Sequence, residues 1–317
     1  MKPILLCLAL PALVTSSFVL ADDQTVKLYG RAHIGVQHSD DGTGSETSAE
    51  SYASRLGVKG SSAISEGLEG FYNIEFEVKM SENANDGKDA ENITARNQFV
   101  GLRGKFGEVL LGRDDTSLKR SQNSFDLMND FSADISSLMA GENRLGDTIR
   151  YTTPSLAHLR FEVSYIAKDN SKQGGESGLS MAASYGDSKF KELPIYVSVA
   201  RDEKVAGRDT SRVTVQGKIG NLTLGGMYQQ SEKLSSDDKQ DSYAVSAAYK
   251  IDSYTLLAQY QDSESDAGKL KDSGTGTSIG VEKSLSKQLR MYLWYSQFEL
   301  DNNADQDHMA LTLRYDF

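Results

Sequence analysis

Four arginines of this chain are placed where their charge could act on a polar solute. Arg31, Arg55 and Arg150 each alternate with apolar neighbours, so each shares one face of an expected strand with other polar side chains. Arg96 opens a further expected strand, in which apolar and polar residues alternate poorly. Together these residues predict a basic row along one side of a polar space.

Carboxylates gather in one long segment, residues 115–146, and could face those arginines. They are Asp126, Asp130, Asp134 and Glu142. Rows of cations and carboxylates that face each other across a narrow aqueous passage create a transverse electric field. Such a field binds and orients polar solutes and penalises apolar ones. For any single arginine, ordinary pairing inside a polar space is the alternative interpretation.

Other residue types offer little chemistry. The four histidines have no spacing that would bring two of them together as metal ligands on one face of a helix. The single cysteine, Cys7, lies in the apolar N-terminal stretch, and a chain from which that stretch is removed would hold no disulfide and no thiolate metal site. We therefore expect no catalytic residue, no metal site and no cofactor, and we predict that the protein is not an enzyme.

Strands are the elements that would position the charged side chains. In residues 308–317, apolar and aromatic side chains at odd positions alternate with polar ones at even positions, as they do across the two faces of a strand. The same period of two recurs at 26–36, 68–78, 243–251 and 254–261. One face of each strand needs an apolar medium and the other needs water.

The connections between these strands alternate in length. We count seven short connections and eight long, acidic ones, which predicts sixteen antiparallel strands with both chain ends on the short-turn side. A soluble sandwich has no reason to keep its long loops at one end, whereas an outer-membrane barrel does. The long connections are expected at 39–50, 81–93, 115–146, 168–176, 202–209, 231–240, 262–273 and 299–305.

The third long connection, 115–146, is unusual because it is rich in apolar residues. Phe125, Met128 and Phe131 are among seven large apolar side chains that would be poorly placed in a loop surrounded by water. Their spacing predicts a short amphipathic helix over 126–139. We expect this third extracellular loop to fold into the barrel and pack on its inner wall, because a lumen of about sixteen strands is wide enough to need a constriction.

The N-terminal residues, the net charge and the mean hydropathy limit the class of protein and its partners. Lys2, the apolar stretch 4–20 and the small residue Ala21 predict a secretory signal peptide over 1–21 and a barrel over 22–317, with a membrane anchor as the less favoured alternative. The net charge of −11, or about −12 once Lys2 is removed, argues against a nucleic-acid partner. A mean hydropathy of −0.46 excludes a helical membrane protein but not a transmembrane barrel, whose inner face is polar.

Several sequence blocks resemble the general diffusion porins of Gram-negative bacteria over the whole mature chain. The blocks lie at 26–31, 54–60, 67–70, 99–102 and 106–113, and the terminal Phe317 also fits. The resemblance implies a sixteen-stranded barrel in the outer membrane, a homotrimer, contact with outer-membrane lipid and lipopolysaccharide, and a third loop that constricts each pore.

The resemblance also assigns residues to that constriction. The basic wall would comprise Arg31, Arg55, Arg96 and Arg144, with Arg150 as a substitute for Arg144. The facing carboxylates would be Asp130 and Asp134. The third loop lacks the proline-bearing acidic segment of some family members, which leaves the shape of the constriction open.

The favoured function is a water-filled channel for passive diffusion of small hydrophilic solutes and ions. The mature charge of about −12 and the acidic loops predict a preference for cations, although the arginine wall works against it. Two alternatives remain open at this point: an outer-membrane barrel enzyme of the protease or lipase type, and a soluble, β-rich secreted adhesin.

Overall fold

A computed structural model describes residues 25–81, 92–236 and 238–317. The expected signal peptide, 1–21, lies outside the described residues, as does most of the long connection expected at 81–93. Among the described helices, none is long and apolar enough to cross a membrane.

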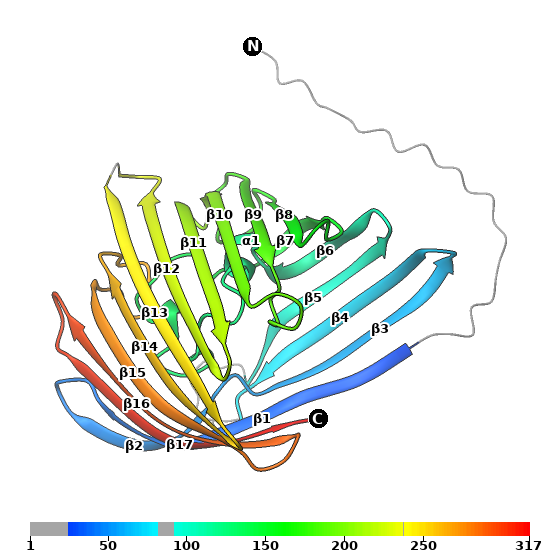
Figure 1. The fold of residues 1–317 in the computed structure, drawn as a ribbon. Helices are drawn as coiled ribbons and strands as arrows, with labels where there is room; N and C mark the ends of the chain where they lie inside the picture. Colours follow the sequence, from blue (N-terminus) through cyan, green and yellow to red (C-terminus); the bar gives the residue numbers. More distant parts are fainter. Residues whose placement is uncertain (1–24, 82–91, 237) are drawn as a thin grey trace.

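The described chain is almost entirely strand, with two short helical turns in one connection (Figure 1). The strands of the first half are β1 (Thr25–Asp40), β2 (Ser45–Ser51), β3 (Arg55–Ser65), β4 (Leu68–Val78), β5 (Ile93–Gly104), β6 (Gly107–Asp115), β7 (Arg144–Thr152) and β8 (Leu159–Ile166). The others are β9 (Gly178–Gly186), β10 (Ile195–Val205), β11 (Arg208–Ile219), β12 (Leu222–Lys233), β13 (Lys239–Ile251), β14 (Tyr254–Ser263), β15 (Gly274–Ser284), β16 (Leu289–Leu300) and β17 (Gln306–Asp316). The helical turns are α1 (Ser117–Ser121) and η1 (Ile135–Ser137).

These segments close into an antiparallel barrel of sixteen strands, as predicted. β2 and β3 share one position in the wall, because β2 pairs with the later half of β1 and β3 with its earlier half. The residues between them interrupt the ladder: the Tyr52 amide donates to the His33 carbonyl at 2.9 Å, and Ala53 has a φ of 47°. Every other strand pairs with its neighbours in sequence, and β17 pairs with β1.

The last strand closes the ring. β17 pairs with β1 from Arg31 opposite Asp316 to Asp40 opposite Asp307. Phe317 and Gly30 extend this ladder through two backbone hydrogen bonds of 3.0 and 3.1 Å. No strand edge is therefore left between the first and last strands, as an apolar surrounding requires.

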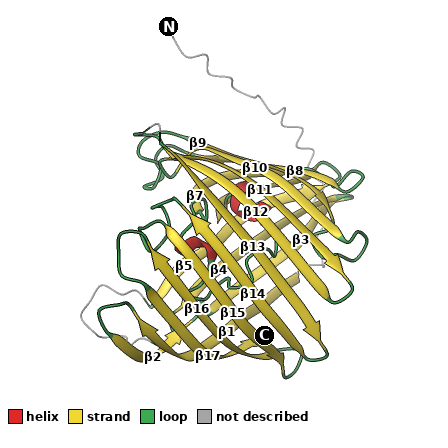
Figure 2. Cartoon of the chain, turned by 60° about the vertical axis from the view of Figure 1, so that its left-hand side comes forward, coloured by secondary structure: helices red, strands yellow, loops and turns green. Residues whose placement is uncertain are grey.

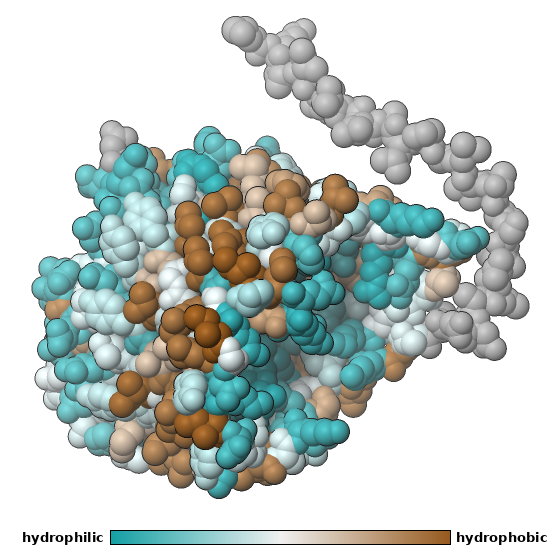
Figure 3. Space-filling model, viewed as in Figure 1, coloured by the Kyte–Doolittle hydropathy of each residue, from teal (hydrophilic) through white to brown (hydrophobic). Residues whose placement is uncertain are grey.

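The wall is polar inside and apolar outside. On β10, Ser198 is 1% exposed while its neighbour Val199 is 51% exposed. On β11, Thr214 is fully buried between the exposed Val213 and Val215. Figure 3 shows apolar side chains gathered in patches on the outer surface of the wall. Exposed apolar and buried polar side chains invert the arrangement of a soluble protein, so the outer face is suited to lipid and the inner face to water.

Two of the long connections are shorter than expected. Residues 39–50 are mostly strand, since β1 extends to Asp40 and β2 begins at Ser45. Residues 202–209 contain only a two-residue turn, Ala206 and Gly207, whose φ values of 52° and 77° match a hairpin turn with two left-handed residues. Polar strands that rise above the apolar zone look like loops in a sequence because neither of their faces is apolar.

The predicted helix over 126–139 is wrong. The helical turns lie at Ser117–Ser121 and Ile135–Ser137, and the residues between them form successive turns. The Asp126 carboxylate accepts hydrogen bonds from the amides of Met128 and Ile135, so a side chain satisfies donors that a helix would pair with carbonyls. Asp130 also has a φ of 76°, which a right-handed helix cannot contain.

Candidate functional site

Two adjoining cavities lie within the barrel, beside the segment 116–143 that carries α1 and η1; Figure 2 shows both helices among the strands. The larger measures about 1070 Å³ and the smaller about 320 Å³. Five residues line both: Arg55, Arg96, Asp115, Arg120 and Arg144. The junction of the cavities therefore presents four guanidinium groups and one carboxylate.

Asp130 is the carboxylate that meets the predicted arginine row. It lies 2.5 Å from Arg31 Nη1 of β1 and 2.6 Å from Arg55 Nη2 of β3. Burial alone would raise the pKa of Asp130, but the guanidinium groups of Arg55, Arg31 and Arg96 outweigh that effect and lower it. Asp130 is thus an ionised link between segment 116–143 and two adjacent strands.

Arg96 lies in the same region but pairs with carboxylates of the wall. Its Nε is 2.8 Å from Glu75 Oε1, and its Nη1 is 2.7 Å from Glu77 Oε2, both on the neighbouring strand β4. Tyr29 donates a hydrogen bond of 3.0 Å to the second oxygen of Glu75. Two strand carboxylates therefore hold Arg96 in place beside Arg55.

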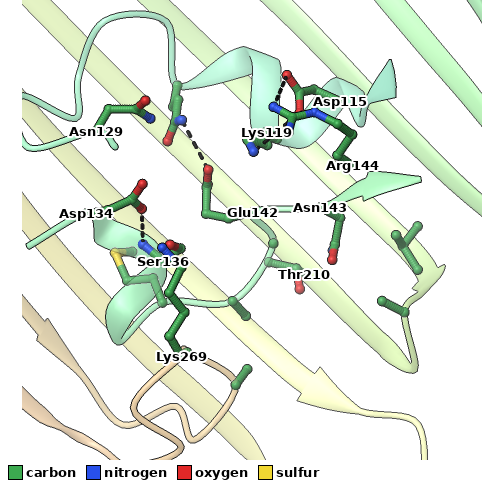
Figure 4. Close-up of a pocket in the computed structure, with 18 of the residues that line it drawn as sticks. Asp115, Lys119, Asn129, Asp134, Ser136, Glu142, Asn143, Arg144, Thr210 and Lys269 are labelled. Atoms are coloured by element: carbon green, nitrogen blue, oxygen red, sulfur yellow. Dashed lines mark hydrogen bonds and ion pairs between the residues drawn. The ribbon is translucent and has the colours of Figure 1, made fainter. Parts of the chain in front are cut away.

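Arg144 pairs with Asp115 across the ends of β6 and β7. Its Nε lies 3.0 Å from Asp115 Oδ1, and Lys119 Nζ of α1 approaches the same oxygen at 3.3 Å. Figure 4 shows Asp115, Lys119 and Arg144 together at one side of the larger cavity. One carboxylate thus serves two cations, as Asp130 does.

Arg150 is placed differently from the other arginines. Its side chain is only 3% exposed and pairs with Asp114, while Nη2 lies 3.3 Å from Glu108 Oε1. It lines the smaller cavity but not the larger one. Arg144, and not Arg150, is therefore the arginine that follows segment 116–143 at the junction.

The other carboxylates of the segment support its conformation. Asp134 caps η1 by accepting from the Ser136 amide at 2.7 Å, and it lines the larger cavity near Lys269 without an ion pair to any described arginine (Figure 4). Asp126 is buried, and its burial together with the charge of Asp134 raises the pKa of Asp126. Glu142 lies 2.7 Å from Arg212 Nη1 of β11. Of the four predicted carboxylates, only Asp130 faces the arginine row.

Aromatic packing fixes the tip of the segment. Phe131 is 5% exposed, and its ring centroid lies 5.1 Å from that of Trp294 and 5.4 Å from those of Tyr292 and Tyr52. Met128 belongs to the same buried cluster. Burial of one such side chain stabilises by about 1.5–3 kcal/mol, so this cluster can hold a segment that has little regular structure.

A second contact area secures the rest of the segment against β11, β12 and β13. Phe125 and Ile135 are fully buried against Met227 and Ala244 of the wall. Arg212 donates from Nη2 to the Ala140 carbonyl at 3.0 Å and pairs with Glu142. Apolar contacts and one buried ion pair thus position Asp130 opposite Arg31 and Arg55.

The sequence reading missed a further group of charged residues at the larger cavity. Asp266 lies 2.5 Å from both Arg208 Nη2 and Lys233 Nζ, and hydrogen bonds from Lys233 and Arg208 lower its pKa. Lys119 and Arg120 of α1 were also missed, since the segment was read as a source of carboxylates. The alternation at 212–216 does place Arg208 on the polar face, so that signal was present.

Metal chemistry has no support in the described part of the chain. No group of three or more histidine, cysteine, aspartate or glutamate side chains there could hold a metal ion. Many of the charged residues around the cavities instead form cation–carboxylate pairs, such as Arg55 with Asp130 and Arg144 with Asp115.

Comparison with known sequences agrees with this architecture. The family model of Gram-negative porins matches residues 7–303. The chain is 27% identical over 289 residues to major outer membrane protein P.IB of Neisseria lactamica, which covers 82% of this chain and 81% of the relative. It is 25% identical over 285 residues to a monosaccharide porin of a Halomonas species, with 84% and 72% covered.

Solved structures share the fold. The anion-selective porin from Comamonas acidovorans superposes with a TM-score of 0.75 at 21% identity, over 93% of this chain and all of that one. Salmonella typhi OmpF in complex with daunomycin gives a TM-score of 0.74 at 18% identity, over 92% and 97%. Because the family model spans nearly the whole chain and the described strands form the same closed barrel, this chain belongs to the Gram-negative porins of the outer membrane.

Proposed function

We propose that this porin is a passive channel for small hydrophilic solutes and ions. The observation that carries the proposal is the pair of adjoining, charge-lined cavities inside a closed barrel whose outer face is apolar. A polar interior of this kind supports water-filled passage, and no step of the function requires a cofactor.

We further propose that segment 116–143 is an inward-folded constriction loop. Its contacts with polar-face residues of distant strands support this role, for example the Leu127 amide with Gln259 of β14 at 2.8 Å. In this proposal the basic wall comprises Arg31, Arg55, Arg96 and Arg144, and Asp130 is the main facing carboxylate. Asp134 contributes negative charge at the larger cavity, and Arg150 contributes positive charge at the smaller cavity.

The preference for cations stays a prediction that rests on the charge of the whole chain. A permeating ion passes closer to the side chains that line the passage than to those of the outer loops. Around the larger cavity, ten lysine or arginine side chains face six carboxylates. This lining opposes a preference for cations, so we do not extend that preference to the passage itself.

The assembly and its surroundings are also proposals. We propose a homotrimer in contact with outer-membrane lipid and lipopolysaccharide, exported by the signal peptide 1–21. One solved structure of similar fold, OmpT of Vibrio cholerae, is described as a trimer form. Native mass spectrometry of the detergent-purified protein should give three copies per particle, and a single copy would exclude the trimer.

Reconstitution tests the channel directly. The purified protein should raise the conductance of a planar bilayer in steps and should let liposomes swell in small sugars, with rates that fall as the sugar grows. Protein unfolded before addition serves as the control. Absence of conductance and swelling would overturn the proposal, and hydrolysis of peptide or lipid without conductance would favour the barrel-enzyme alternative.

A further inference from the structure

The junction of the two cavities offers unused hydrogen-bond donors. Arg55, Arg96, Arg120 and Arg144 each hold at least one terminal guanidinium nitrogen with no hydrogen-bond partner among the described residues. A guanidinium group carries five N–H donors, and it matches the geometry of carboxylate and phosphate oxygens. Each of the four also pairs with at least one carboxylate: Arg55 with Asp130, Arg96 with Glu75 and Glu77, Arg120 with Glu162, and Arg144 with Asp115. Their remaining free donors, gathered at the junction, form a surface suited to an oxyanion.

Shared carboxylates leave positive charge in excess along the passage. Asp266 serves Arg208 and Lys233 where β11 begins and β12 ends. Asp115 serves Lys119 and Arg144 at the junction in the same way. Each group has two cations for one carboxylate, so each keeps one net positive charge beside the water-filled space.

Asp130, which also lines the larger cavity, repeats this pattern. It pairs with both Arg31 and Arg55. Arg31 also meets Asp316, which Arg314 neutralises in turn. Three separate carboxylates of the passage are therefore each shared by two cations.

Three lysines add charge at the larger cavity. Lys172, Lys269 and Lys271 line it, are exposed, and form no ion pair with any residue in the described part of the chain.

Carboxylates do oppose this charge: Glu75 and Glu77 surround Arg96, and Asp134 lines the same cavity. The balance over the larger cavity nevertheless favours cationic side chains, ten to six.

We propose that this lining selects small anions and that the arginine junction is a transient binding station for oxyanions such as inorganic phosphate or small carboxylates. The lysines and the Asp266 group raise the local concentration of anions, and the junction arginines donate to their oxygens as they pass. This inference rests on the proposed channel function and reverses the ion preference that the net charge of −11 predicts.

Zero-current potentials across a planar bilayer test the sign of the preference. With potassium chloride at about 0.1 M on the dilute side, chloride should permeate at least about twofold better than potassium. The ratio should approach one when both sides exceed about 1 M, because the Debye length then falls to about 3 Å. Millimolar inorganic phosphate at constant ionic strength should reduce the chloride current.

Matched variants locate the effect. The double variant Lys269→Gln/Lys271→Gln should lower the chloride-to-potassium ratio by about half, since it removes two unpaired charges from the cavity. Lys189→Gln/Lys191→Gln makes the same change on exposed residues of a short turn outside both cavities, and should leave the ratio unchanged. Arg144→Gln should weaken the effect of phosphate more than Arg144→Lys does.

The outcomes separate the two proposals. A conducting wild-type channel with a cation-directed potential would overturn the anion inference and leave the channel intact. Equal effects of the two double variants would also contradict it, because general surface charge would then explain the selectivity. A failure to conduct at any salt concentration would overturn the channel function itself.

Discussion

At the scale of single residues, Asp130 connects the parts of the site. It is the one carboxylate of segment 116–143 that pairs with the predicted arginine row, through Arg31 and Arg55. Asp130 can serve both arginines because a carboxylate oxygen has more than one lone pair, and its Oδ2 accepts hydrogen bonds from Arg31 Nη1 and Arg55 Nη2. Asp130 therefore links the segment tip to β1 and β3 and places a carboxylate at the larger cavity.

Neutralising Asp130 should increase the preference for anions. Asp130→Asn leaves Arg31 and Arg55 without their shared carboxylate, so the zero-current potential in a salt gradient should shift toward the chloride value. Asp252→Asn removes the same charge from an exposed short turn outside both cavities and should cause no shift. A shift toward potassium in Asp130→Asn would contradict the placement of the two arginines at the passage.

The effect of Asp130 on the zero-current potential should persist in mild acid. Its pKa is lowered, so the pairing with arginine is present above the ordinary aspartate value of about 3.9 and is lost only as the pH falls through the lower value in the folded protein. The difference in zero-current potential between wild type and Asp130→Asn should persist at about pH 4 and vanish in stronger acid. Loss of that difference already near pH 5 would show that Asp130 is not held by the arginines.

At the scale of elements, segment 116–143 is positioned by side-chain contacts and not by regular structure. Its two helical turns are short, and carboxylates of Asp126 and Asp134 satisfy backbone amides that no helix covers. Such a segment depends on what it packs against. Tyr52, Trp294 and Tyr292 supply that surface for its tip.

Removing the Phe131 ring should make the tip of segment 116–143 more mobile and so widen the passage. Phe131→Ala deletes the ring that packs on Trp294, a change that typically costs about 3–5 kcal/mol in a buried cluster. The mean single-channel current and its open-channel noise should both rise. Phe161→Ala truncates the same residue type on the exposed outer face of β8 and should leave both unchanged. Unchanged noise in Phe131→Ala would mean that the other contacts of the segment hold it without the aromatic anchor.

At the scale of the whole molecule, closure of the barrel makes the interior possible. Arg31 of β1 and Asp316 of β17 lie 285 positions apart in the sequence, yet they pair as neighbours. Closure removes the two free edges that lipid would not tolerate, and it separates the apolar outer face from the charged inner face. Every contact across the lumen depends on it.

A disulfide can test this closure and its register. Val36→Cys/Leu311→Cys places thiols on directly opposed residues of β1 and β17, whose Cα separation of about 4.5–5.5 Å suits a disulfide. Oxidation should cross-link the pair and change its electrophoretic mobility. Val36→Cys/Leu313→Cys is displaced by two residues, about 7–8 Å, and should cross-link poorly. Equal cross-linking in both variants would indicate a different register.

Much of this architecture was predictable because it depends on local patterns. The alternation in 308–317 placed Thr312 and Arg314 on one face and Leu311 and Leu313 on the other, and the exposed fractions agree. Short and long connections predicted sixteen strands, although 202–209 proved to be a tight turn. Side-chain direction in a strand follows from a period of two whatever the partner strand is, so sequence alone can assign faces.

The tertiary structure alone decided which charges meet. Arg31 and Asp130 are 99 residues apart, and nothing in either local pattern indicates that Asp130 pairs with arginines while Asp126 and Asp134 cap backbone amides. The sequence by itself determined the barrel and the polar face of its arginines, since both follow from local alternation. The course of segment 116–143, and the excess of cations at the junction, depend on packing between distant strands and became visible only in three dimensions.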